Sequence, residues 1–226
     1  FKKYIQKRIE GFSAAAIIGK KEFMGLTLKV NEQVLIPRPD TETWLEKVIQ
    51  YYRNETGLKV ADLGTGSGAI LVGFLYYCRD AVGVGVDIST EALKIAEENG
   101  QNLKITDRVE WRQGDYLKAF DEEDIFDGIF SNPPYIPTKD IGGLSREVKH
   151  EPRLALDGGT DGLYFYHLLA KGAAEHLKPG GFLAVEFGIG QATDILEMFR
   201  KSAQYEDFEV IKDYGGIERA LYCRKK

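Results

Sequence analysis

Cysteine is scarce in this sequence of 226 residues, which contains only Cys78 and Cys223. The two residues lie far apart in the chain and lack the close pairing of metal ligands, so no metal site is expected from them. Cys78 falls in an apolar helical run and Cys223 in a predicted terminal strand. We therefore expect two buried free thiols in a protein of the reducing cytoplasm.

Long apolar runs and excess basic charge are also lacking. No segment reaches the length of a membrane span, and no signal-peptide pattern is visible. The 35 acidic side chains outnumber the 30 basic ones, which gives a formal net charge of −5. Such a chain has no overall attraction to phosphate backbones, so a nucleic-acid substrate is disfavoured, although a local basic patch is still compatible with this charge.

What the sequence does contain is an alternation of apolar strand-like segments and helix-like segments. Unbroken apolar strands of this kind are typical of a parallel sheet with helices on both faces. The link between the last two strands is too short for a parallel crossover. The sequence therefore predicts an α/β fold with a doubly wound, mostly parallel seven-stranded sheet and an antiparallel last strand. Its strands are predicted at residues 58–63, 81–86, 109–113, 126–131, 182–187, 208–212 and 219–223.

A short β-hairpin is predicted ahead of this sheet. Residues 22–36 alternate between apolar and polar side chains and contain Gly25. The prolines at 37 and 39 end the hairpin, and Asp40 or Thr41 then caps a helix that continues to about residue 53.

The first ten residues have helical spacing, and the sequence opens with Phe1 rather than Met. We expect the end of a helical domain whose preceding part is missing. The predicted division is a helical remnant with its linker at 1–20, the hairpin at 21–42 and the catalytic domain at 43–226.

A glycine-rich turn follows the first predicted strand of the sheet. The segment VADLGTGSG, residues 60–68, runs from strand through turn into helix. Glycines let the backbone approach a ligand, and the free N–H groups of the helix face the crevice beyond the strand ends. Asp87 follows the second strand about 20 residues later, where an acid accepts hydrogen bonds from ribose hydroxyls. Together they indicate a nucleoside-bearing cofactor, although the turn alone is compatible with a purely structural role.

The glycine spacing separates two classes of cofactor. Gly64, Gly66 and Gly68 give G-x-G-x-G rather than the dinucleotide pattern G-x-G-x-x-G. With Asp62 in front, this resembles the first motif of S-adenosylmethionine-dependent methyltransferases, whose cofactor has an ammonium group suited to a carboxylate. The residues expected to bind it are Asp62, Gly64, Thr65, Gly66, Ser67, Gly68, Asp87 and Ile88.

A further pair of candidate cofactor residues, Asp115 and Tyr116, comes just after the third strand. There the carboxylate can accept from an adenine amino group and the phenol ring can stack on the base. A polar loop with a surface tyrosine is the alternative.

The segment Asn132-Pro133-Pro134-Tyr135 ends the fourth strand, which lies beside the first in a sheet of this kind and so faces the methyl donor. An amide or aromatic amine nitrogen attacks poorly because its lone pair is delocalised. The side-chain oxygen of Asn132 and the carbonyl oxygen of Pro133 can hold both hydrogens of an NH₂ group and orient that lone pair. Tyr135 offers a flat wall for stacking. A strand-terminating turn is the alternative, because these are also ordinary turn dipeptides.

This tetrapeptide and the glycine loop together resemble the amino-methyltransferases, which act on exocyclic amines of bases or on glutamine side chains. Three more segments narrow the resemblance: VLIPRPDTE at 34–42, VDIS at 86–89 and EPRLALDGG at 151–159. They are similar to the protein-(glutamine) methyltransferases of peptide-chain release factors, and the similarity covers the chain from about residue 16 onward.

The resemblance implies a Rossmann-like methyltransferase that transfers a methyl group from S-adenosylmethionine to the glutamine of the Gly-Gly-Gln motif in release factors, leaving S-adenosylhomocysteine. By analogy, Gly64 to Gly68, Asp87, Tyr116 and Asn132 bind the cofactor. The expected catalytic residues are Asn132, Pro133 and Tyr135. The expected substrate-binding residues are Asn132, Pro133, Pro134, Tyr135 and Arg38, of which Arg38 either steers the substrate or pins the hairpin to a loop. Release factors are the expected partners, with no membrane and no direct nucleic-acid substrate.

The sequence departs from the family pattern in two places. The sequence pattern indicates only the last helix of the family's N-terminal helical domain, the part that helps to dock the release factor. Asp213 to Arg219 matches the family's D-x-A-G-x-x-R only loosely, and we expect it to lie away from the site. Conversely, this chain has Pro39 at a position where the related methyltransferases of a ribosomal-protein glutamine tend to have serine. This difference favours a release factor as the substrate.

The sequence does not assign a role in the site to several further polar residues. We expect structural roles for His167 and His176, whereas His150 lies in the long loop at 139–162 and is left open. Glu186 at the end of the fifth strand is either a satisfied buried acid or a group that orders a loop. The alternative functions are methylation of a ribosomal-protein glutamine, methylation of a nucleic-acid base, and a non-catalytic binding module.

Overall fold

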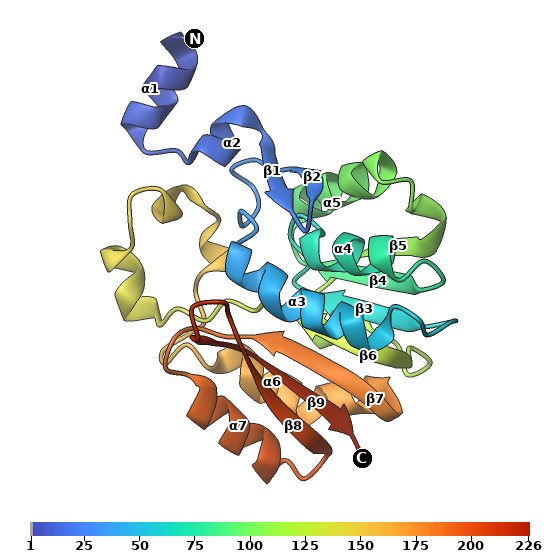
Figure 1. Ribbon diagram of the computed structural model, residues 1–226. Helices are drawn as coiled ribbons and strands as arrows, with labels where there is room; N and C mark the ends of the chain where they lie inside the picture. The colour runs from blue at the N-terminus through green and yellow to red at the C-terminus, as the bar shows by residue number, and fades with distance from the viewer. Residues whose placement is uncertain (1) are drawn as a thin grey trace.

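Seven strands form one mixed sheet in the computed structural model, which describes residues 2–226. The strands are β3 (Lys59–Leu63), β4 (Val82–Asp87), β5 (Val109–Gln113), β6 (Phe126–Ser131), β7 (Leu177–Glu186), β8 (Tyr205–Lys212) and β9 (Glu218–Lys225). Their order across the sheet is β5-β4-β3-β6-β7-β9-β8, and β9 runs antiparallel to both of its neighbours. The predicted fold class is confirmed, with the last strand inserted between β7 and β8 (Figure 1).

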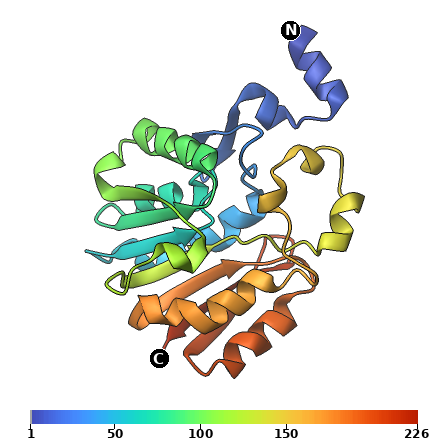
Figure 2. The same cartoon turned by 180° about the vertical axis from the view of Figure 1, so that it is seen from behind.

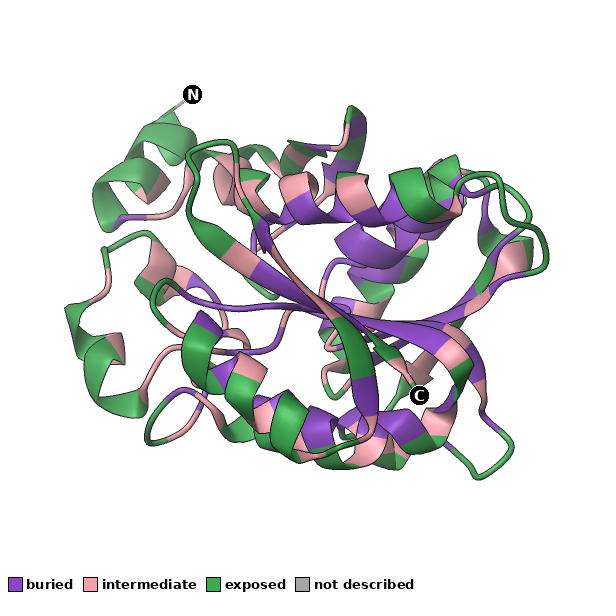
Figure 3. Cartoon of the chain, turned by 60° about the horizontal axis from the view of Figure 1, so that its bottom comes forward, coloured by how far each residue is buried: buried purple, intermediate pink, exposed green. Residues whose placement is uncertain are grey.

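Helices cover both faces of this sheet. One face is covered by α3 (Pro39–Tyr52) and α4 (Ala69–Tyr77). The other face is covered by α6 (Tyr164–Gly172) and α7 (Ala192–Lys201). Figure 2 shows α6 and α7 from behind. The helix α5 (Thr90–Asn102) packs beside β4 and β5. Because apolar side chains from both faces meet the strands, the strands themselves are largely buried (Figure 3).

The N-terminal elements differ from the prediction in extent. They are α1 (Lys2–Glu10), α2 (Ala14–Ile18) and the two-stranded hairpin of β1 (Lys20–Phe23) and β2 (Leu26–Lys29), while Phe1 lies outside the described residues. The hairpin is shorter than the predicted 21–42 because its two-residue turn falls at Met24 and Gly25, which both have positive φ. At the end of the hairpin, the N–H of Lys29 donates to Oδ1 of Asn99 on α5 at 2.6 Å, and its carbonyl oxygen accepts from Nδ2 of Asn99 at 3.0 Å.

The start of α3 also corrects an expectation. Neither Asp40 nor Thr41 caps the helix, which begins at Pro39 with Arg38 in the N-cap position and no side-chain cap. Proline suits the first helical position because its fixed φ is helical and its missing N–H has no partner there anyway. With the N-cap two or three residues earlier than expected, Thr41 lies inside the helix, where its side chain is buried.

The long segment between β6 and α6 has only short 3₁₀ helices, η3 (Thr138–Gly143), η4 (Val148–His150) and η5 (Arg153–Ala155). It projects beyond the carboxyl ends of the strands, in yellow in Figures 1 and 2. Its end returns to the sheet through a parallel bridge between Ile136 and Asp157. The loop is therefore anchored beside the end of β6.

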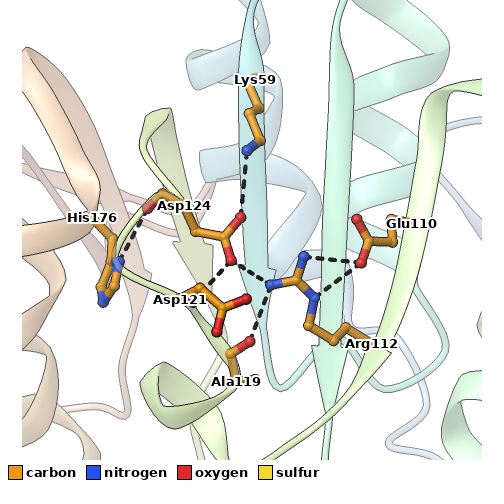
Figure 4. Close-up of polar contacts among 7 residues, drawn as sticks. All are labelled: Lys59, Glu110, Arg112, Ala119, Asp121, Asp124 and His176. Atoms are coloured by element: carbon orange, nitrogen blue, oxygen red, sulfur yellow. Dashed lines mark hydrogen bonds and ion pairs between the residues drawn. The ribbon is translucent and has the colours of Figure 1, made fainter.

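Asp124, in the turn before β6, is the centre of a polar network that fixes this part of the fold (Figure 4). Its carboxylate accepts hydrogen bonds from Arg112 and Lys59, and its backbone oxygen lies 3.0 Å from Nδ1 of His176. The network joins the start of β3, the end of β5 and the turn before β6 to η6 (Ala173–His176). His176 is therefore a structural residue, as predicted.

The two thiols, Cys78 and Cys223, are free and buried, which agrees with the prediction. Among residues 2–226, no helix has the length and apolar content needed to cross a membrane.

Candidate active site

A cavity of about 360 Å³ opens at the carboxyl ends of β3, β4 and β6. This is the edge at which open α/β sheets bind ligands. The predicted site residues that line it are Gly64, Gly66, Asp87, Ile88, Asp115, Tyr116, Asn132 and Pro134. The predicted site residues that do not line it are Asp62, Thr65, Ser67, Gly68, Pro133, Tyr135 and Arg38.

The glycine loop is tied to the neighbouring strand by its backbone. The N–H groups of Gly64 and Thr65 both donate to the carbonyl oxygen of Val86 at 2.9 Å. Gly66 has a φ of 55°, and a Cβ built on it would meet no atom within 4 Å. The backbone at Gly66 therefore lies open to the cavity, as close approach to a ligand requires.

Gly68 has a different reason to be glycine. A Cβ there would lie 3.0 Å from Trp111 and 3.1 Å from Ala96, and its φ is +79°. This glycine is therefore required for packing between the loop and helix α5, and it does not line the cavity.

Asp62 lies buried beneath the loop, with no exposed surface. The hydroxyl of Thr65 donates to its Oδ2 at 2.6 Å, whereas Oδ1 has no hydrogen-bond partner among the described residues. Burial raises the pKa of Asp62 to about 7; the charge of Asp87 acts in the same direction and the Thr65 hydrogen bond opposes both. A buried acid with an unpaired oxygen is suited to a cationic partner.

Asp87 ends β4 with both carboxylate oxygens directed by the backbone. The N–H of Gly66 donates to Oδ2 at 2.8 Å and the N–H of Ser89 donates to Oδ1 at 2.9 Å. Burial raises the pKa of Asp87, while these hydrogen bonds lower it. A carboxylate accepts about four hydrogen bonds, so two lone pairs are left for a ligand in the cavity.

Tyr116 is a buried wall of the cavity and not a surface residue. Its hydroxyl bonds Ser131 Oγ, which in turn donates to the carbonyl of Leu63 at 2.8 Å, so the phenol bridges the ends of β3 and β6. Its ring centroid lies 4.8 Å from that of Phe165. The backbone of Tyr116 has a φ of 56°, a conformation that orients its ring toward the glycine loop, 3.5 Å from a Cβ on Gly64.

Asn132 follows directly on β6, which pairs with β3 so that Ser131 lies opposite Leu63. The predicted adjacency of this segment and the glycine loop is therefore confirmed. The side-chain oxygen Oδ1 of Asn132 is buried and has no hydrogen-bond partner among residues 2–226. An amide that lines a cavity with an unpaired carbonyl oxygen is placed to accept a hydrogen bond from a ligand.

Pro134 and Tyr135 are braced by residues of the segments that follow Asp157 and Glu186. A Cβ on Gly158 would lie 2.7 Å from the carbonyl oxygen of Pro134, and one on Gly188 would lie 3.0 Å from the Tyr135 ring. Gln191 also donates to the carbonyl of Tyr135 at 3.1 Å. Burial, followed by the nearby charge of Glu186, raises the pKa of Tyr135 to about 12, so the phenol stays protonated.

Glu186 is the residue whose role the sequence left open between a satisfied buried acid and a group that orders a loop. It ends β7 with only 3% of its surface exposed, and its Oε2 accepts hydrogen bonds from Thr41 at 2.6 Å and Trp44 at 2.8 Å. Burial raises the pKa of Glu186, and hydrogen bonds from Thr41, Trp44 and Asn132 oppose the rise. An acid that closes an apolar strand was the only sequence signal for this contact.

Arg38 pairs with a carboxylate in the long loop. Its guanidinium lies 2.6 Å from Oε1 of Glu151, and the N–H of Ile36 donates to the other oxygen at 3.2 Å. Of the two predicted roles for Arg38, the structure favours pinning of the N-terminal segment to the loop.

Two expectations about more distant residues are settled by contacts. His150 lies 2.9 Å from the carbonyl of Glu10 and stacks on Phe12, so it fastens the N-terminal segment and does not line the cavity. Asp213 and Arg219 were expected to lie away from the site, and neither lines the cavity. Arg219 pairs with Asp213 at 2.8 Å and with Asp40 at 3.0 Å, which holds the β8–β9 turn against the start of α3.

Comparison with known proteins places the chain among methyltransferases. Residues 54–213 match a family model described as a methyltransferase domain. Over 226 aligned residues the chain is 44% identical to the release factor glutamine methyltransferase of Bradyrhizobium diazoefficiens, covering 98% of this chain and 75% of the relative. It is 40% identical to the enzyme of the same name from Moorella thermoacetica, covering 98% and 78%.

Solved structures share the fold at lower sequence identity. A methyltransferase from Pyrococcus furiosus superposes with a TM-score of 0.65 at 22% identity, covering 100% of this chain and 99% of that one. The Thermus thermophilus 16S rRNA N2 G1207 methyltransferase, solved with AdoMet and guanosine, superposes with a TM-score of 0.64 at 19% identity, covering 92% and 50%.

Proposed function

This chain belongs to the family of release factor glutamine methyltransferases, and on that premise we propose that S-adenosylmethionine is its methyl donor and that the acceptor is the glutamine of the Gly-Gly-Gln motif in peptide-chain release factors. One observation carries the proposal: Asn132 lines the same cavity as Gly66 and Asp87, and its Oδ1 is buried with no hydrogen-bond partner among residues 2–226. A hydrogen-bond acceptor for an NH₂ group thus shares a pocket with residues suited to a nucleoside.

The residues around the glycine loop fit the proposed cofactor. Asp87 has lone pairs left for the ribose hydroxyls, and the unpaired Oδ1 of Asp62 is suited to the ammonium group. The open backbone at Gly66 leaves room for close approach, and Tyr116 supplies an aromatic wall. When bound, S-adenosylmethionine supplies an electrophilic methyl group on a sulfonium sulfur.

The residues after β6 act on the acceptor amide. Asn132 Oδ1 and the carbonyl oxygen of Pro133 accept the two N–H bonds of the glutamine, which directs its lone pair and favours a pyramidal nitrogen. Tyr135 stacks on the planar amide. No strong base is needed before transfer, because the nitrogen becomes acidic once it carries the new methyl group and its surplus proton then passes to water.

A transfer assay with three acceptors tests the proposal. Labelled S-adenosylmethionine is supplied with a release factor, a ribosomal protein or DNA, and the labelled residue is identified by mass spectrometry. We expect label on the glutamine of the Gly-Gly-Gln motif. Label on the ribosomal protein or on a DNA base, or none on any acceptor, contradicts it.

A further inference from the structure

The carboxylate of Glu186 is held in one place by helix α3. Thr41 and Trp44, both near the start of that helix, donate to the same oxygen Oε2 at 2.6 and 2.8 Å. The backbone oxygen of Glu186 accepts from the Tyr166 hydroxyl at 2.9 Å, so α6 fixes the residue from the opposite face of the sheet. A side chain that is 3% exposed and bonded in this way has little rotational freedom.

Asn132 is the neighbour of Glu186 across the sheet, because β6 and β7 run parallel with Ser131 opposite Val185, and it acts on Glu186 as a hydrogen-bond donor that lowers the pKa of the acid. Only the NH₂ end of an amide can donate a hydrogen bond, so the end of the Asn132 amide that faces Glu186 must be the NH₂ group. The carbonyl end must then turn away from Glu186. This is the oxygen that is buried with no partner in the described part of the chain, on a residue that lines the cavity.

We propose that Glu186 is a positioning residue that fixes the orientation of the Asn132 amide, and that this orientation makes the site accept a glutamine side chain and reject glutamate. The inference rests on the function proposed above, since it concerns how the acceptor is chosen.

The selection follows from which group Asn132 presents. A carbonyl oxygen attracts the NH₂ group of glutamine and repels the carboxylate of glutamate, which has no hydrogen to donate at neutral pH. If the Asn132 amide turned over, its NH₂ group would face the acceptor and would favour a carboxylate. Fixing one amide orientation therefore separates two side chains of nearly the same shape.

Glu186→Gln is the decisive variant, because it keeps the size of the side chain but offers Asn132 a donor as well as an acceptor. The Asn132 amide then has two acceptable orientations. Two quantities are measured on the full chain: the turnover number with a release factor, and the affinity ratio between that release factor and its Gln→Glu variant in the Gly-Gly-Gln motif. Calorimetric affinity for S-adenosylmethionine monitors the integrity of the cavity.

We expect turnover and the glutamine-to-glutamate affinity ratio each to fall by about tenfold, with cofactor affinity unchanged to within about twofold. Glu197→Gln, the same change on an exposed acid of α7, should leave all three at wild-type values. An unchanged affinity ratio overturns the inference, whether or not turnover falls, since a purely structural role would lower turnover without altering discrimination.

Trp44→Phe provides a second test if the first variant does not fold. It removes the indole N–H that bonds Glu186 and keeps an aromatic ring in the core, so a smaller fall in the affinity ratio, about threefold, is expected. A ratio identical to wild type contradicts the inference. The affinity ratio is a binding measurement, so its result does not depend on whether the methyl group is transferred. Failure of the wild-type chain to methylate any release factor would refute the proposed function, whereas an unchanged affinity ratio would refute the role of Glu186.

Discussion

Asp62 and Thr65 form a buried hydrogen bond of 2.6 Å beneath the glycine loop, and this bond satisfies only one of the two carboxylate oxygens. The loop therefore rests on an acid whose charged form is costly, and the pKa of Asp62 is raised to about 7 by burial. This relationship makes ligand binding and stability depend on pH.

Cofactor affinity is expected to rise with pH between 6 and 8 because ionised Asp62 attracts an ammonium group. Asp87, whose charge also raises the pKa of Asp62, is the other acid at this loop. In Asp62→Asn, binding should be weaker, by roughly tenfold at pH 8, and the rise with pH should be lost. Calorimetry on both proteins measures this, and the ammonium group of the cofactor titrates equally in both, so the difference belongs to Asp62. Parallel pH curves would contradict the assignment.

The same pKa has the opposite consequence for the protein without ligand. A folded-state pKa above the unfolded value contributes stability at low pH, which is lost as pH rises through about 7. Urea unfolding of the unliganded wild type should therefore show a loss of stability between pH 5 and 8 that is absent in Asp62→Asn. A wild-type loss no larger than that of the variant would show that Asp62 is not the source.

Gly158 packs closely against the segment that follows Asn132. A Cβ at this position would lie 2.7 Å from the Pro134 carbonyl, and the glycine has no positive φ, so Gly158→Ala acts through crowding alone. We expect the methyl-transfer rate to fall by roughly ten- to a hundredfold, since small misplacements of reacting groups cost that much. Gly142→Ala is the matched control, because a Cβ there meets nothing within 4 Å. Equal rates in the two variants would contradict the role given to Gly158.

Arg38 and Glu151 predict a pH-dependent effect on stability. Arg38→Met leaves the buried Glu151 with one backbone donor, from Ile36, and should lower the free energy of unfolding by about 2 kcal/mol at pH 8. Burial already raises the pKa of Glu151, and loss of Arg38 raises it further. The free energy of unfolding of the variant is therefore reduced most at high pH, and it returns toward the wild-type value as Glu151 is protonated. Urea unfolding at pH 8 and pH 5 measures this.

Adding Glu151→Gln to Arg38→Met should restore part of the lost stability at pH 8, because it removes the buried charge. A loss that is the same at both pH values, with no rescue by the second change, would mean that the ion pair is not what fastens the loop.

The sheet and the glycine loop could be predicted from the sequence because their signals are local. The apolar runs of strand length and the turn at Gly64 and Gly66 each consist of consecutive residues. The spacing of apolar residues in each segment distinguishes a strand from a helix. The adjacency of Asn132 to the loop followed from the topology of parallel sheets alone.

The contacts that complete the site could not be predicted because they join distant residues. Glu186 is 145 positions from Thr41 in the sequence, and Glu151 is 113 positions from Arg38. No periodic pattern links such pairs, so the acid at the end of β7 and its partners on α3 emerge only when the sheet is assembled. The pair of Arg219 with Asp40 could not be predicted for the same reason, since it depends on how one turn folds back.

The most direct test is the single-turnover rate of Asn132→Ala with a release factor, measured beside its affinity for S-adenosylmethionine. We predict a fall in rate of about 10²- to 10³-fold, because the acceptor amide loses the oxygen that directs its lone pair, while cofactor affinity falls by less than about fivefold. A rate close to that of the wild type would contradict the account that Asn132 holds the reacting nitrogen.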